Sequence, residues 1–191
     1  MIRLARSALV LPFTALLCSC AGSRLPPTET VPQVELSRFM GDWFVIACIP
    51  TFIEKNAYNA IESYRLAEDG TVATTFTFRD GSFEGELKRY TPRGFIVDKS
   101  SNAVWGMQFI WPIKAEYRIS YLDPAYSQTV ITRTARDYVW VMARTPSIPD
   151  ADFARLVELI DKLGYATANL RKVPQYWPQT GYGPVIPKGS L

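Results

Sequence analysis

Apolar and polar side chains alternate in a series of short segments between residues 43 and 145. The alternation is clearest in 71–79, 103–111, 116–122 and 138–145, and weaker in 43–49, 60–66, 83–90 and 129–133. A period of two is that of a β-strand with two different faces. Turn-forming stretches separate the segments, such as EDG at 68–70, RDG at 79–81 and DPAY at 123–126. This spacing predicts about eight strands in an antiparallel meander.

One helical pattern follows the strands. Its apolar positions recur at helical spacing and are Phe153, Leu156, Val157, Ile160 and Leu163. Asp150 is placed to cap the helix and Gly164 to end it. A helix with one apolar stripe must pack on another surface. The pattern therefore predicts an all-β fold: an eight-stranded antiparallel up-and-down β-barrel with one C-terminal α-helix on its outside, able to enclose a small apolar ligand.

Both ends of the chain lie outside this pattern. Residues 1–19 contain two arginines, an apolar run and small residues, the organisation of a secretory signal that is too short to cross a membrane as a helix. Residues 20–35 are polar and proline-rich and predict a flexible tether. We assign residues 36–177 to the barrel and its helix, and 178–191 to a proline- and glycine-rich disordered tail.

The end of the signal resembles a bacterial lipobox. In LLCSC at 16–20, Leu17 stands three places before Cys20 and Ser19 directly before it. The resemblance implies cleavage before Cys20 and its acylation, with secretion of an unlipidated chain as the alternative. Acylation of Cys18 is disfavoured because bulky Leu17 would then precede the cut. Since Ala21 replaces the aspartate that retains such lipoproteins in the inner membrane, the resemblance implies an outer-membrane anchor with the barrel facing the periplasm.

Composition narrows the available chemistry. A chain of 191 residues with 48% hydrophobic content can bury one core. Its net charge is only +3, and Arg3 and Arg6 of the signal contribute two of these charges, so a nucleic-acid partner is disfavoured. The chain has no histidine, which excludes Ser-His-Asp and Cys-His arrangements and imidazole metal ligands. We therefore expect no cofactor and no metal.

Two kinds of reactive group remain to be interpreted. Acylation of Cys20 would leave Cys48 as the one thiol of the mature chain, so no disulfide framework can form. Cys48 is either a small apolar core residue, which we favour, or a reactive nucleophile. Glu84 and Glu86, two places apart, resemble the carboxylate pair of a glycosidase, but a solvated strand face is the simpler interpretation.

Three sequence elements resemble the motifs of the lipocalin family. GDW, with Gly41 and Trp43, opens the first strand after a turn-forming ELSRFM. RDY at 136–138, with Asp137 and Tyr138, resembles the second motif, although arginine stands where threonine is commonest. Arg144 stands where the third motif places a basic residue. The match covers residues 35–177 and is most similar to the bacterial outer-membrane lipocalins, notably in DYVWVMARTP at 137–146.

This resemblance implies that Trp43 plugs the closed end of the barrel and that Arg144 packs across it. General physical chemistry supports the assignment, because a guanidinium over an indole face contributes about 0.5–2 kcal/mol. Gly41 permits the tight backbone turn into the strand.

Side-chain parity assigns one set of residues to the barrel interior. The set is aromatic or apolar, and its tyrosine hydroxyls suit an acyl chain with a polar head. Each member could equally be a core residue, but together they exceed what a small barrel needs. We assign to ligand binding Phe76, Phe78, Trp105, Met107, Phe109, Tyr117, Ile119, Tyr121, Tyr138, Trp140 and Met142.

These observations favour a lipid-binding protein over a catalyst. The expected ligand is a fatty acid such as palmitate, or a lysophospholipid, held near the outer membrane for transport, storage or envelope repair. The protein is expected to attach to the membrane through acylated Cys20, as a monomer or a homodimer, without enzymatic activity. The alternatives are an enzyme in which Cys48 or a tyrosine acts on a bound lipid, and a purely structural envelope lipoprotein.

Overall fold

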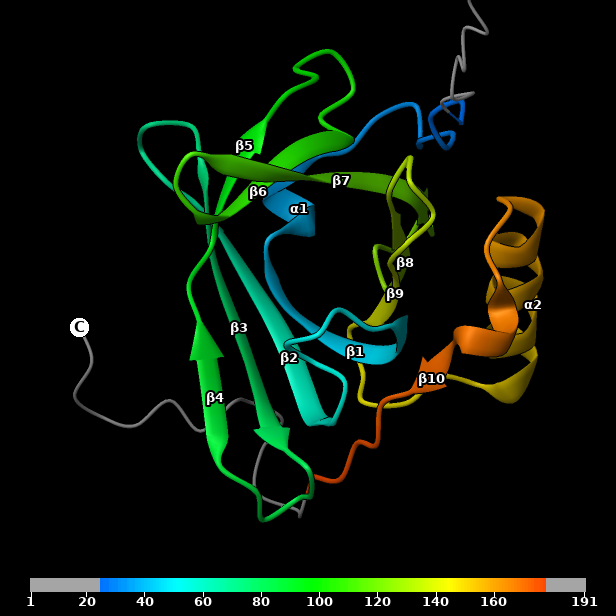
Figure 1. Ribbon diagram of the computed structural model, residues 1–191. Coiled ribbons are helices and arrows are strands. Elements are labelled where there is room, and N and C mark those ends of the chain that lie inside the picture. Colours follow the sequence, from blue (N-terminus) through cyan, green and yellow to red (C-terminus); the bar gives the residue numbers. More distant parts are fainter. Residues whose placement is uncertain (1–24, 178–191) are drawn as a thin grey trace, which may run out of the picture.

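The computed structural model describes residues 25–177, and its core is one antiparallel sheet that closes on itself (Figure 1). In chain order the strands are β1 (Gly41–Ile49), β2 (Ala57–Leu66), β3 (Val72–Asp80), β4 (Leu87–Tyr90), β5 (Arg93–Ile96), β6 (Val104–Ile110), β7 (Ile113–Leu122), β8 (Gln128–Thr132), β9 (Val139–Ala143) and β10 (Arg171–Lys172). The strands pair in the order β1-β2-β3-β5-β6-β7-β8-β9, β9 pairs with β1 to close the barrel, and short β10 adds to β1. The predicted eight-stranded barrel is confirmed, because β4 and β5 both pair with β3 and occupy one strand position.

Two details of the sheet differ from the predicted strands. The segment predicted at 83–90 is a strand only from Leu87, and β5 resumes beyond Pro92. Proline lacks the N–H that a continuous ladder requires, so the strand breaks there. Glu84 and Glu86 are exposed in the loop before β4, and Glu86 pairs with Lys88 at 2.6 Å. The pair therefore has none of the burial that glycosidase chemistry requires.

Two α-helices accompany the barrel, α1 (Leu36–Phe39) and α2 (Asp150–Lys162), with a 3₁₀ turn η1 (Thr167–Asn169) after them. α2 lies outside the barrel, next to β8 and β9 (Figure 1), and buries Leu156 and Ile160. The predicted cap was wrong by one residue: Pro149 is the N-cap and Asp150 is the first helical residue. Gly164 ends the helix at φ +88°, a conformation that favours glycine.

A tryptophan and an arginine close the α1 end of the barrel. Trp43 is fully buried, and its Nε1 donates to the Phe39 carbonyl at 2.8 Å. The Arg144 guanidinium lies 3.8 Å from the centre of the Trp43 ring. It also donates to the carbonyls of Arg38, Phe39, Met40 and Asp42 at 2.8–3.0 Å. Gly41 enters the strand at φ +96°, where a Cβ would lie 3.3 Å from Arg144 Nη1.

Residues 25–35, which belong to the predicted flexible tether of 20–35, run along the barrel wall. Val31 N donates to the Ile119 carbonyl at 2.9 Å, and Val34 N donates to the Ser101 carbonyl at 2.8 Å. The Val34 side chain is fully buried. Sequence analysis missed this packing because isolated valines between prolines give no periodic pattern. Residues 1–24, including the signal and Cys20, and the tail 178–191 lie outside the described residues.

The plug carries a stability prediction. Trp43→Ala should lower the free energy of unfolding by about 3–5 kcal/mol, because it leaves a large cavity in a packed region. Trp111→Ala is the matched control, since Trp111 is 82% exposed and its loss should change stability by about 0.5 kcal/mol or less. Urea unfolding followed by circular dichroism measures both. Equal midpoints for the two variants would contradict the role of Trp43.

Candidate ligand-binding cavity

The barrel contains a cavity of about 260 Å³ between its core and the end opposite α1. Loops β1–β2 and β8–β9 and the β6–β7 hairpin surround this open end. Six of the residues that parity assigned to ligand binding line the cavity: Phe76, Met107, Phe109, Tyr117, Tyr138 and Trp140. Four strands and one loop contribute them. Alternation within each strand predicted which side chains face inward, and the barrel brings these faces together.

Four other members of the predicted set do not line the cavity. Phe78, Trp105, Ile119 and Met142 are almost fully buried in the same core cluster as Trp43. Trp105 stacks on Tyr117 with ring centres 5.1 Å apart. These side chains point inward as parity predicts. Trp105, Ile119 and Met142 fill the closed half of the barrel beneath the cavity, whereas Phe78 packs against Phe76 and Tyr90 on the side of β3 and β4.

The interior placement of Tyr121 was wrong. The β7–β8 register shifts between Ile119 and Tyr121, and a shift of one residue moves the following side chain to the other face. Tyr121 packs with the outer cluster under α2, and its hydroxyl accepts from Arg155 at 3.0 Å. Nothing in the local alternation marks this bulge.

A carboxyl group in the cavity was missed by the sequence analysis. Glu62 of β2 lines the cavity and accepts a hydrogen bond from the Tyr64 hydroxyl. Because the Tyr64 hydroxyl hydrogen is used in this bond, the Tyr117 hydroxyl donates to the Tyr64 hydroxyl oxygen at 2.8 Å. Burial raises the pKa of Glu62 from 4.5 to about 7, against the opposing effect of the Tyr64 hydrogen bond. Glu62 faces inward because β2 and β3 slip in register near Tyr58 and Ile61.

A second carboxyl group fastens the β1–β2 loop over the open end. Glu54 is 4% exposed and accepts from Thr51 N at 3.0 Å and from Trp140 Nε1 at 3.1 Å. Burial raises its pKa despite these donors. Because Trp140 belongs to β9, this hydrogen bond ties the β1–β2 loop to the last strand of the barrel.

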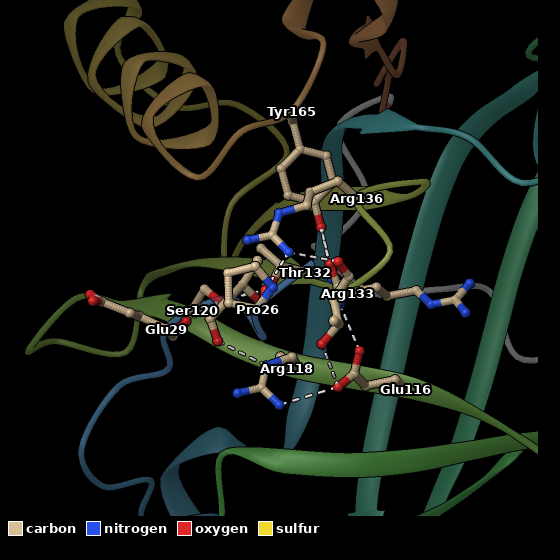
Figure 2. A network of polar contacts seen from close by, with 11 residues as sticks. Pro26, Glu29, Glu116, Arg118, Ser120, Thr132, Arg133, Arg136 and Tyr165 are labelled. Carbon is tan, nitrogen blue, oxygen red and sulfur yellow. Dashed lines mark hydrogen bonds and ion pairs between the residues drawn. The ribbon is translucent and has the colours of Figure 1, made fainter. Parts of the chain in front are cut away.

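One cation, Arg133, also lines the cavity. It follows β8 at the open end. Its backbone N donates to the Tyr165 hydroxyl at 2.7 Å, and that hydroxyl donates back to its carbonyl at 3.0 Å. Figure 2 shows the Arg133 side chain pointing away from this network. It pairs with Asp137 at 3.1 Å, and its Nε is buried without a hydrogen-bond partner among the described residues.

The remaining candidates for chemistry lie away from the cavity. Cys48 is fully buried in the core, and burial raises the pKa of its thiol, so thiolate chemistry is suppressed. Within residues 25–177 no three metal-ligating side chains gather at one place. No helix in the same range is long and apolar enough to span a membrane.

Comparison with known proteins places this architecture in a family. The model of the lipocalin-like domain matches residues 34–175. The chain is a lipocalin. It is 30% identical over 159 residues to temperature-induced lipocalin-1 of Arabidopsis thaliana, covering 77% of this chain and 82% of that protein. It is 25% identical over 173 residues to the outer membrane lipoprotein Blc of Vibrio cholerae, covering 89% and 99% respectively.

Solved structures support the lipocalin fold at low sequence identity. Insecticyanin from the tobacco hornworm Manduca sexta superposes with a TM-score of 0.62 and 13% identity, over 80% of this lipocalin and 92% of that chain. The cockroach allergen Per a 4 gives a TM-score of 0.60 and 16% identity, over 80% and 94%. The fold is therefore shared while most side chains differ.

The buried Glu62 predicts a pH-dependent stability. Between pH 4.5 and about 7 the folded lipocalin keeps a proton on Glu62 that the unfolded chain has lost. The free energy of unfolding therefore falls as pH rises through this window, and above about pH 7 Glu62 lowers it no further. The stability gain of Glu62→Gln over the parent should therefore grow up to about pH 7 and then stay constant. Urea unfolding at three pH values measures it. Glu84→Gln, at an exposed loop position, is the control, and an equal step there would contradict the prediction.

Proposed function

We propose that this lipocalin is a lipid-binding lipoprotein that holds one acyl chain of a fatty acid or lysophospholipid, with the polar head at the mouth of the barrel. The observation that carries the proposal is the largely apolar cavity in the barrel, with Arg133 among the residues that line its open end. Glu62 lies deeper, in register with Trp43 of the plug. The Arg133 guanidinium attracts a carboxylate or phosphate head to the mouth, while the apolar chain extends toward the plug.

The size of the cavity favours a slender ligand. A volume of about 260 Å³ lies near the lower end of small-molecule sites, at about 300 Å³. A single chain fits this space better than a lipid with several chains. Each buried methylene contributes about 0.8 kcal/mol, so a long chain reaches micromolar affinity even after the cost of ordering it.

Two features support attachment to the outer membrane. The lipobox-like LLCSC, ahead of the barrel, supports acylation of Cys20, and the similar protein of Vibrio cholerae carries the name outer membrane lipoprotein. We propose that the barrel faces the periplasm and stores, carries or clears amphiphiles there. A binding role without catalysis accords with the buried thiol of Cys48 and with a chain that has no histidine.

Ligand occupancy is tested at the cavity wall. A neutral fluorescent probe, N-phenyl-1-naphthylamine, should bind the wild type and be displaced by palmitate or a lysophospholipid. Phe109→Asp should weaken binding about tenfold or more, because the ligand would then have to cover a charged, hydrated side chain on the cavity wall. Phe109 is already 49% exposed, so the variant can fold. Val97→Asp, at the closed end and 65% exposed, should bind as the wild type does; equal affinity of all three would contradict this site.

The orientation of the head is tested at Arg133. Arg133→Met should weaken palmitate binding by about ten- to hundredfold, the effect of losing a charged hydrogen bond of about 1.5–3 kcal/mol. It should leave the affinity for neutral N-phenyl-1-naphthylamine unchanged. Arg89→Met removes an exposed arginine of β4 that does not line the cavity, and it should change neither. A parallel loss for both ligands would show a general packing defect instead.

The membrane anchor has its own test. Cys20→Ala should move the protein from the membrane fraction to the soluble periplasmic fraction, because stable attachment needs two or more acyl chains. Mass spectrometry of the wild type should find those chains on Cys20. An unchanged membrane fraction for Cys20→Ala would argue against lipidation there.

A further inference from the structure

The rim of the open end carries large apolar side chains that the fold leaves in solvent. The β6–β7 hairpin contributes Ile110, Trp111 and Ile113, which are 72%, 82% and 70% exposed, and the β1–β2 loop contributes Phe52 at 80%. Two of them, Phe52 and Ile110, also line the cavity. Exposed clusters of this kind mark interaction sites, and aromatic side chains favour the boundary between water and lipid. We refer to these four residues as the apolar rim.

The N-terminal segment leads directly to this end of the barrel. Figure 2 shows Pro26 and Glu29 beside Arg118, Ser120 and Arg136. The Ser120 hydroxyl donates to the Glu29 carbonyl at 2.5 Å, and Arg136 Nη1 donates to the Pro26 carbonyl at 2.5 Å. Arg136 lies in the loop between β8 and β9, which belongs to the open end. The chain therefore leaves the described structure beside the mouth.

The segment crosses β7 on its way to this end of the barrel. Arg118 Nε of β7 donates to the Thr28 carbonyl at 2.9 Å, and the Thr28 hydroxyl lies 2.7 Å from the Thr132 hydroxyl of β8. Beyond Thr28 the segment therefore continues past the end of β8 to the β8–β9 loop, where Arg136 holds Pro26.

Only five peptide steps separate Leu25 from Cys20, and they span at most about 17 Å. An acylated Cys20 therefore holds this side of the mouth within reach of the membrane. We propose that the apolar rim docks into the headgroup region of the membrane that holds Cys20, so that the cavity opens toward the bilayer and exchanges its ligand with it directly. The inference rests on the proposed acylated anchor, while the rim itself is independent of which ligand the cavity binds.

The charges near the mouth favour one-sided docking on a bilayer. Exposed Lys114 follows the hairpin tip, and exposed Lys55 lies with Phe52 in the β1–β2 loop, where they can meet anionic headgroups. Asp80 and Glu84 lie in or beside the β3–β4 loop, and anionic headgroups repel them, so contact through that loop is disfavoured. Four side chains are too few for a stable dimer, which needs about 800 Å² on each partner. They suffice to orient a protein that its acyl chains already hold.

The experiment places an environment-sensitive probe on the rim of the acylated protein in vesicles of phosphatidylethanolamine and phosphatidylglycerol. Cysteine is introduced as Ile110→Cys and, as a matched control at the closed end, as Ala125→Cys, which is also exposed. Both are labelled with a nitrobenzoxadiazole dye; Cys48 is fully buried and should not react. Lipids with a headgroup-level spin label should quench the dye at 110 at least about threefold more than at 125, since only the rim reaches the interface.

Two outcomes would overturn the inference. Equal quenching at both positions in protein that sediments with the vesicles would show an attached barrel without preferred orientation. Burial of the dye at 110 in the absence of vesicles, with a doubled mass in solution, would show that the rim pairs with a second copy. Protein left in the supernatant would contradict both the anchor and the docking.

A second variant connects docking with exchange. Trp111→Glu combined with Ile113→Glu should slow transfer of a fluorescent lysolipid from vesicles to the protein by about tenfold, because two charged residues leave the interface. It should leave the affinity for N-phenyl-1-naphthylamine in solution unchanged. Unchanged transfer would overturn the docking. Failure of the wild type to bind N-phenyl-1-naphthylamine would count against the proposed ligand site alone.

Discussion

The fold depends on the contact between Trp43 and Arg144. The indole fills the closed end of the barrel and the guanidinium lies 3.8 Å from its ring centre. The same guanidinium satisfies carbonyls at the end of α1 and at the start of β1. Helix ends leave such carbonyls without partners, so one side chain joins the α1 end, the first strand and the last barrel strand. Closing one end in this way leaves the other free to form a cavity.

The interior is graded from the plug toward the mouth. Large buried aromatic side chains fill the closed half, and Trp105 stacks on Tyr117 above them. Tyr117 also lines the cavity, so it forms the boundary between core and ligand space. Through Tyr64 it is linked to Glu62, whose buried carboxyl has a raised pKa. The base of the cavity therefore carries a buried polar network of Glu62, Tyr64 and Tyr117 among apolar side chains.

The outer surface of the barrel is organised around the β8–β9 loop. Arg136 donates to the Leu163 carbonyl at the end of α2 and to the Pro26 carbonyl of the N-terminal segment, and Tyr165 holds the backbone of Arg133. Arginine at 136 thus replaces the more common threonine of the family motif with a side chain that is long enough to join two segments. The cation that lines the cavity and the segment that leads to Cys20 share one small scaffold.

The sequence by itself determined the strands and the outer helix of this lipocalin and the side chain that closes the barrel. Alternation, turn residues and the three motifs predicted the barrel, the outer helix and the Trp43 plug, because period, turn chemistry and a large side chain at a strand start are local properties. Only the tertiary structure decided which inward residues remain next to empty space. Register shifts between strands turned Tyr121 outward and brought Glu62 inward, and a shift depends on two strands at once. The course of residues 25–35 along β7 was likewise decided by contacts with residues about ninety positions away, and a segment without a periodic pattern of its own carries no local record of such contacts.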